Sequence, residues 1–136
     1  MKIYVGCAIT TVPEDKADEF VALINSVKNS IRDSGHEVLE FRTALFPDAT
    51  DEEVYIHDIH DCVGTADAML AICDHSSIGL GYELATAIEK RGIPVVAVAH
   101  KDIKISKLVL GISHPKFVFE RYDTAEDIVP ILLKHI

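Results

Sequence analysis

Five short apolar runs alternate with segments of helical periodicity along this chain, and that alternation restricts the fold more than any other feature. The runs, which we expect to be strands, cover residues 2–8, residues 36–41, the stretch that ends at Cys73, residues 93–99 and residues 116–120. Strands separated by helices form a parallel sheet, because each helix carries the chain back along the sheet. The pattern predicts a three-layer α/β fold of flavodoxin/Rossmann-like type, with five parallel strands in the order 2-1-3-4-5 and helices on both faces.

Capping residues mark the expected helices. Pro13 suits the first turn of a helix that ends near Asp33, and Thr50 opens a capping-box sequence for the next one. Further helices are expected over residues 82–89, over residues 104–110 and from Thr124 to the C-terminus. Residues 42–50 show little periodicity, so we expect a loop there that borders the functional site.

Length and composition limit the possible functions. A chain of 136 residues with 49% apolar residues is expected to fold as one domain over residues 1–136. A net charge of −9 argues against nucleic acid or an anionic membrane as partner. Neither a signal peptide nor an apolar run of about 18 residues is visible, which predicts a cytoplasmic location. The three cysteines form no CxxC pair and are expected to be reduced thiols.

The expected strand order places a ligand crevice between the carboxyl ends of the first and third strands. The turn after Cys7 and the turn at Ser76 and Ser77 would meet there. The serines can cap the following helix, while Gly79 and Gly81 remove side chains where backbone N–H groups would face a ligand. This indicates a cradle for an oxygen or an anion. The alternative is structural: the serines only cap, and the glycines allow close packing of helix on sheet.

Carboxylates near this crevice suggest glycosyl transfer. Asp58 and Asp61 are three apart on one expected helix, so both can face the same side, opposite Glu83. Two carboxylates about a sugar C–N bond can act as nucleophile and as the group that assists the departing base. The alternative is that the helix acids are solvated surface residues.

Other kinds of site are weakly supported. His57 and Asp61 are i, i+4 neighbours, but the Glu of an HExxH motif is missing and no second His/Cys cluster has ligand spacing. The chain also lacks a GxSxG elbow, a GxxxxGK[ST] loop and a GxGxxG turn after its first strand. We therefore expect no metal and no organic cofactor.

Ala66 and Asp67, an apolar strand and the run from Ser77 to Glu83 together resemble the AD…SxGxGYE signature of the nucleoside 2-deoxyribosyltransferase family. This family includes deoxynucleoside 5′-monophosphate N-glycosidases. The resemblance implies cleavage of the N-glycosidic bond of 2′-deoxynucleosides or their 5′-monophosphates. The acceptor would be water in a hydrolase or a second base in a transferase, and the small-molecule substrate would need no metal.

The resemblance also implies roles for individual residues. Glu83 matches the nucleophile that forms a covalent deoxyribosyl-enzyme intermediate, and Tyr4 resembles the first-strand tyrosine that orients it. Asp58 matches the carboxylate that assists base departure. Asp61 stays an alternative, because the spacing from Asp58 to Asp67 is one residue longer than usual.

Substrate-binding residues follow in the same way. Ser77 matches the serine near the sugar 5′ oxygen or phosphate, with Gly79 and Gly81 in its loop. Ser106 resembles a serine supplied to the neighbouring subunit's site, which implies a homodimer or a larger assembly.

The turn after the first strand departs from the family pattern. Ala8 and Thr10 stand where the monophosphate N-glycosidases carry a serine and an arginine, and loss of the arginine weakens phosphate binding. Cys7 stands where the family pattern has a glycine, and we interpret Gly6 as that glycine in a displaced position. We expect Cys7 and Thr10 to line the substrate site, with compensating charge from a basic residue: His75, Lys101 or Lys104. These departures leave a non-catalytic nucleotide-binding or sensing domain as the alternative.

Overall fold

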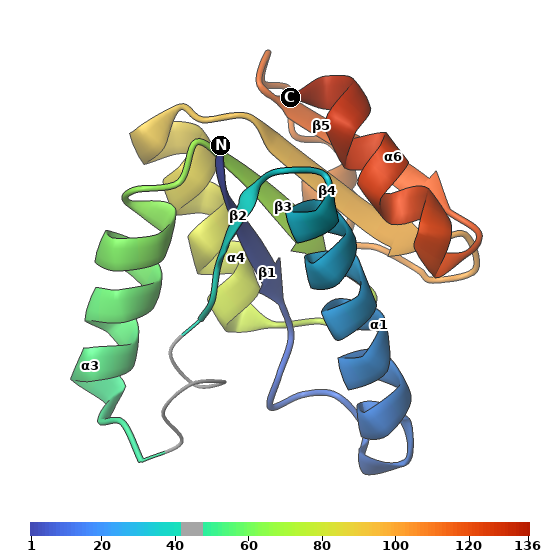
Figure 1. The fold of residues 1–136 in the computed structure, drawn as a ribbon, viewed down its shortest axis with the longest axis horizontal. Helices are drawn as coiled ribbons and strands as arrows, with labels where there is room; N and C mark the ends of the chain where they lie inside the picture. Colours follow the sequence, from blue (N-terminus) through green and yellow to red (C-terminus); the bar gives the residue numbers. More distant parts are fainter. Residues whose placement is uncertain (42–47) are drawn as a thin grey trace.

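A computed structural model describes residues 1–41 and 48–136, and it shows a five-stranded sheet in which every pair of neighbours is parallel. The strand order is β2-β1-β3-β4-β5, which confirms the predicted fold class and order (Figure 1). The strands are β1 (Lys2–Cys7), β2 (Glu37–Leu39), β3 (Ala68–Ile72), β4 (Val95–His100) and β5 (Phe117–Tyr122). β2 lies at the edge as expected. It is shorter than the predicted 36–41, because only three of its residues pair with β1.

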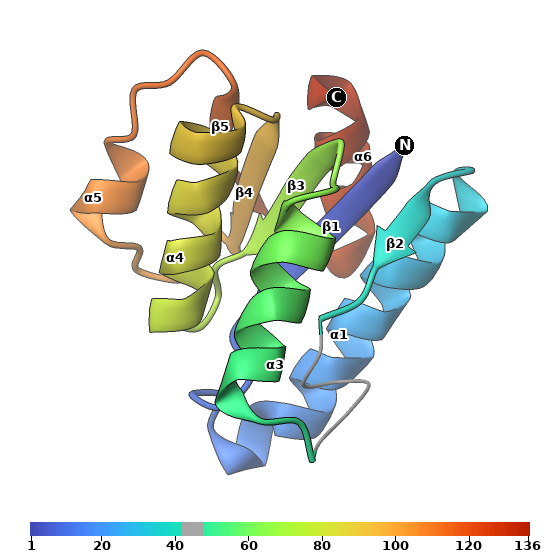
Figure 2. The same cartoon turned by 90° about the vertical axis from the view of Figure 1, so that its left-hand side faces the viewer.

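Helices cover both faces of the sheet (Figures 1 and 2). One face carries α1 (Glu14–Asp33) and α6 (Ala125–His135). The other carries α3 (Asp51–Tyr55) with its continuation η1 (Ile56–Val63), α4 (Ile78–Ala85) with its continuation η2 (Thr86–Arg91), and the short α5 (Lys107–Leu110). Of the expected loop over 42–50, residues 42–47 lie outside the described part of the chain.

Two of the helices begin at residues other than those predicted. α4 starts at Ile78, four residues before the expected start, because the Ser77 hydroxyl accepts the Leu80 N–H and caps its first turn at 3.1 Å. α5 starts only at Lys107, where Ser106 caps the Leu108 N–H in the same way at 3.2 Å. Both starts are set by a serine cap, which satisfies a backbone N–H that has no partner within the helix.

Alternation along the central strands divides the core into two layers, one on each face of the sheet. Ile3 and Val5 of β1 pack with α1 and α6, whereas Tyr4 packs with η1 and α4. The same alternation holds in β3, where Leu70 faces α1 and Met69 faces α4. Tyr4 is therefore buried beneath the helix that carries Glu83.

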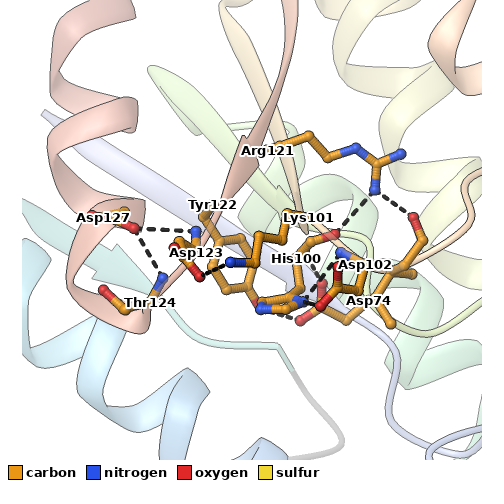
Figure 3. A network of polar contacts seen from close by, with 10 residues as sticks. Asp74, His100, Lys101, Asp102, Arg121, Tyr122, Asp123, Thr124 and Asp127 are labelled. Atoms are coloured by element: carbon orange, nitrogen blue, oxygen red, sulfur yellow. Dashed lines mark hydrogen bonds and ion pairs between the residues drawn. The ribbon is translucent and has the colours of Figure 1, made fainter.

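The Asp74 carboxylate ties the ends of three strands together (Figure 3). Asp74 follows β3, and its side chain accepts the His100 N–H at 2.8 Å and the Tyr122 hydroxyl. Burial and the Asp74 charge raise the pKa of Tyr122 above its ordinary value, so that hydroxyl keeps its proton as the donor. These bonds fix the start of the turn between β3 and α4.

Among the described residues, none of the helices has both the length and the apolar character that crossing a bilayer requires.

Replacing Tyr122 with phenylalanine tests the strand-end network. The Tyr122→Phe change removes one donor from the Asp74 carboxylate, and a hydrogen bond to a charged group contributes about 1.5–3 kcal/mol. We expect the free energy of unfolding in urea to fall by that amount. Tyr82→Phe, at a side chain that is 55% exposed, is the matched control and should change it by less than about 0.5 kcal/mol. Equal effects of the two changes would contradict the network's role.

Candidate active site

A hydrogen bond between β1 and α4 forms the centre of the site. The Tyr4 hydroxyl donates to Oε1 of Glu83 at 2.9 Å, and Tyr4 itself is only 1% exposed. Because the tyrosine is fixed within the core, it restricts the rotamer of a half-buried carboxylate on the neighbouring helix. The structure thus brings together two of the residues predicted from sequence, from positions 79 residues apart.

Glu83 is poised between its protonated and ionised forms near neutral pH. Desolvation, with a smaller contribution from the charge of Asp58, raises the pKa of Glu83 to about 7, while the hydrogen bond from Tyr4 acts in the opposite direction. Burial and the same two carboxylates raise the pKa of Tyr4 well above its ordinary value. Tyr4 therefore remains a donor whenever Glu83 ionises.

Asp58, and not Asp61, faces this pair. Asp58 is 9% exposed, and its charge acts on both Tyr4 and Glu83. The Asp61 side chain is 65% exposed and lies 3.6 Å from Nδ1 of His57. The sequence left the choice between the two open, and this geometry favours Asp58.

The wide turns of η1 account for the unusual spacing of Asp58. η1 is a π-helix, in which the Gly64 N–H donates to the Ile59 carbonyl, five residues back, at 2.8 Å. A π-helical turn contains one more residue than an α-helical turn. The extra residue between Asp58 and Asp67 is therefore absorbed within the helix, and Asp58 still points inward.

Gly6 is a requirement that the sequence interpretation missed. A Cβ atom at this position would lie 2.9 Å from Oε2 of Glu83 and 2.8 Å from Cε of Met69. The sequence reading treated Gly6 as a displaced turn glycine. It lies within β1, where its lack of a side chain makes room for the Glu83 carboxylate. Neighbouring Cys7 is half-buried, and burial raises the pKa of its thiol to about 12.

Two cavities lie beside β1 and α4, and neither is lined by Tyr4, Asp58 or Glu83. One, of about 250 Å³, lies between the end of β1 and α1, and Cys7, Phe20 and Phe41 line it. Lys28 also lines this cavity, where it forms an ion pair with Glu40 at 2.5 Å.

The other cavity, of about 180 Å³, lies between the β3–α4 turn and the segment before α5. Ser77, Ser106, Lys104 and His75 line it, so Ser106 reaches the neighbourhood of Ser77 within a single chain. The homodimer implied by the resemblance, with Ser106 acting across its interface, stays a prediction.

Gly79, Gly81 and Thr10 are the remaining residues predicted to bind substrate. Gly81 lines the second cavity, and a Cβ there would meet nothing within 4 Å. A Cβ at Gly79 would lie 3.7 Å from the Ser77 hydroxyl, so close packing of helix on sheet does not account for these two glycines. Thr10 is exposed, and it is the adjacent Thr11 that donates to the Ser76 carbonyl at 2.5 Å.

Of the three basic residues considered as replacements for the missing arginine, Lys104 is the best placed. It lines the same cavity as Ser77 and Ser106. Lys101 forms an ion pair with Asp123 at 2.7 Å, and the His75 ring packs edge-on against Phe20.

A pair of alanine substitutions tests the role of Gly6. Gly6→Ala places a methyl group against the Glu83 carboxylate and should lower the free energy of unfolding by about 1–3 kcal/mol. Gly81→Ala puts the same group in open space within a helix and should raise it by about 0.5–1 kcal/mol. Chemical denaturation checks both, and a Gly6→Ala protein as stable as the wild type would contradict the proposed close fit.

Known proteins include relatives of this chain. No protein-family profile matches the chain. A protein of Syntrophotalea carbinolica, provisionally named 2′-deoxynucleoside 5′-phosphate N-hydrolase 1, is 34% identical over 82 residues, which are 60% of this chain and 56% of that protein. A Methanococcoides burtonii protein with the same provisional name is 34% identical over 87 residues, 60% of this chain and 70% of that protein.

A solved structure shares the whole fold. CMP N-glycosidase of Clostridium botulinum superposes with a TM-score of 0.75 over 100% of both chains, at 12% sequence identity. By these relatives and the shared fold, the chain belongs to the nucleoside 2-deoxyribosyltransferase-like family.

Proposed function

We propose that this protein hydrolyses the N-glycosidic bond of 2′-deoxynucleoside 5′-monophosphates. The observation that carries the proposal is the Glu83 carboxylate, which is bound by the buried Tyr4 hydroxyl and has Asp58 as its charged neighbour. The names of the relatives point to the same bond and the same class of substrate.

The proposed reaction has two steps. Ionised Glu83 attacks C1′ of the sugar, so a C1′–O bond forms while the C1′–N bond breaks and its electron pair leaves with the base. Tyr4 holds Oε1, which makes Oε2 the attacking oxygen, and Asp58 stabilises the charge on the sugar and assists the departing base. Water then attacks C1′ and loses a proton, the C1′–O bond to Glu83 breaks and deoxyribose 5-phosphate is released. That proton balances the one that the departed base takes up. A second base in place of water would give transfer.

The cavity beside α4 is the proposed phosphate site. Ser77, Ser106, Lys104 and His75 line it, so a cation and neutral polar groups are available to an anion there. Asp74 lines it too, and its carboxylate is held by the His100 N–H and the Tyr122 hydroxyl. Lys104 would bind phosphate as a point charge, whereas the arginine of the family pattern binds it through two parallel hydrogen bonds. Phosphate recognition in this protein would therefore depend on fewer fixed contacts.

The first test uses chromatography to measure free base released from 2′-deoxynucleosides and from their 5′-monophosphates. Each substrate is tried with and without a second base as acceptor. We expect release from monophosphates without an acceptor. Glu83→Gln should lower the rate by at least about a thousandfold, because it removes the nucleophile while keeping the shape. Glu89→Gln, at an exposed position on η2, is the matched control. A folded wild-type protein that binds nucleotide without turnover would instead be the non-catalytic binding domain.

The phosphate site has its own test. Lys104→Gln should raise the KM for a monophosphate by at least about tenfold, because it removes the cavity's cation, and should change the KM for the corresponding nucleoside little. Lys101→Gln is the control, since Lys101 is paired with Asp123. An unchanged KM in Lys104→Gln would place the phosphate elsewhere.

The pH dependence follows from the raised pKa of Glu83. Because attack requires the ionised form, kcat/KM should rise with pH through about 7. The Tyr4 hydrogen bond lowers the pKa of Glu83, so Tyr4→Phe should move this midpoint to higher pH. Tyr55→Phe, at a side chain 45% exposed, should leave it in place. A midpoint that stays the same in Tyr4→Phe would show that another group controls the profile.

A further inference from the structure

Three potential metal ligands converge on the inner side of η1. One donor atom from each of His57, Asp58 and Cys62 lies within 4.8 Å of the other two. Nε2 of His57 and Sγ of Cys62 are 3.6 Å apart. The Glu40 carbonyl oxygen lies 2.9 Å from that nitrogen and 3.3 Å from that sulfur, so a backbone donor stands beside the three side chains.

The π-helical form of η1 creates this arrangement. Residues five apart on an α-helix point about 140° away from each other. The wide turns of η1 instead bring His57 and Cys62 to the same side, and they leave Asp58 buried next to them. The sequence analysis considered His57 with Asp61 and missed Cys62, because HExxH-type spacing assumes α-helical geometry.

The separations suit a tetrahedral ion. Zn²⁺ binds imidazole nitrogen at about 2.0–2.1 Å and thiolate sulfur at about 2.3 Å, so a tetrahedron holds these two atoms roughly 3.5 Å apart. The observed separation of Nε2 and Sγ is 3.6 Å. A nitrogen, a sulfur and a carboxylate oxygen are also a donor set that zinc accepts.

Asp61 supplies an outer partner for the histidine. Its Oδ2 atom lies 3.6 Å from Nδ1 of His57, on the opposite side of the ring from Cys62. A carboxylate in this place favours the tautomer that carries its proton on Nδ1, which leaves Nε2 free to bind a metal. Histidines that bind zinc commonly have a carboxylate beside their other ring nitrogen.

We propose that His57, Asp58 and Cys62 form a binding site for Zn²⁺, and that the bound ion inhibits the enzyme. On binding, the Cys62 thiol loses its proton to solvent and a Zn–S bond forms. The proton on Nε2 of His57 is exchanged through solvent for one on Nδ1, so the ring stays neutral. The site's remaining position can be taken by the Glu40 carbonyl or by water.

Inhibition follows from the position of Asp58, and this part of the proposal rests on the proposed function. A carboxylate that binds zinc cannot also stabilise the sugar or assist the departing base. The cation would also offset the negative charge of Asp58, which acts on Glu83 in the metal-free protein. Metal binding itself depends only on the donor set, so it is tested separately.

The binding test is a competition for zinc between the untagged protein and a chromophoric chelator. We expect one tight site per chain, and replacement of zinc by Co²⁺ should give a thiolate-to-cobalt charge-transfer band. His57→Gln and Cys62→Ser should each weaken zinc binding by at least about 10- to 100-fold, which is the usual effect of losing a residue that only orients a metal ligand. The glutamine of His57→Gln can still donate to the Glu40 carbonyl. His60→Gln, exposed on the same helix, and Cys73→Ser are the matched controls.

Circular dichroism should show that all four variants remain folded. Equal zinc affinity in the wild type and in His57→Gln, or a cobalt complex without the thiolate band, would overturn the site.

The inhibition test measures base release in a zinc buffer, with each protein compared with its own zinc-free rate. We expect the wild type to lose activity as the zinc concentration rises and to regain it when zinc is chelated. His57→Gln should need at least tenfold more zinc for the same degree of inhibition. Zinc that binds through Cys62 and leaves the rate unchanged would overturn the inhibitory role. Tight binding in a protein without turnover would support the site and argue against the proposed function instead.

Discussion

The hydrogen bond from Tyr4 to Glu83 is the contact on which the organisation of the site depends. It crosses from the third residue of β1 to α4, the helix that follows the central strand, and it forms only because Gly6 leaves room for the carboxylate. Tyr4 points toward α4 because side chains alternate along β1. The parallel pairing of β1 with β3 then sets the distance between the two residues. Sheet register, strand alternation and a missing side chain thus combine to orient one oxygen atom.

Burial raises the pKa of the Glu83 carboxyl that takes part in this contact. A carboxylate in a partly desolvated position loses some of the stabilisation that water gives its ionised form, and a nearby second carboxylate adds to that effect. A single hydroxyl donor offsets part of the cost while it fixes the rotamer. Glu83 is consequently held in one orientation, with a pKa raised to about 7.

Local signals in the sequence were sufficient for the sheet order and the capping-box start of α3, and the family resemblance predicted Glu83 beside Tyr4. The features that escaped prediction all depend on contacts between distant residues. The need for glycine at position 6 arises from a carboxylate 77 positions further along the chain. Thr10, which was predicted to line the substrate site, is exposed, and it is Thr11 that contacts the β3–α4 turn, because the path of the loop decides which side chain faces that turn. The π-helical form of η1 has no local marker, and the burial of Asp58 within it favours Asp58 over Asp61.

The Asp74 network has a consequence for the order in which the molecule is built. Asp74 begins the turn that leads to Ser77, yet its hydroxyl donor, Tyr122, lies 48 residues further along the chain at the end of β5. Contacts of such long separation in sequence form slowly and late, because the intervening chain must first lose its freedom. During synthesis the turn between β3 and α4 would therefore stay incompletely held until the last strand joins the sheet. The site would therefore be complete only in a chain that has folded through its last strand.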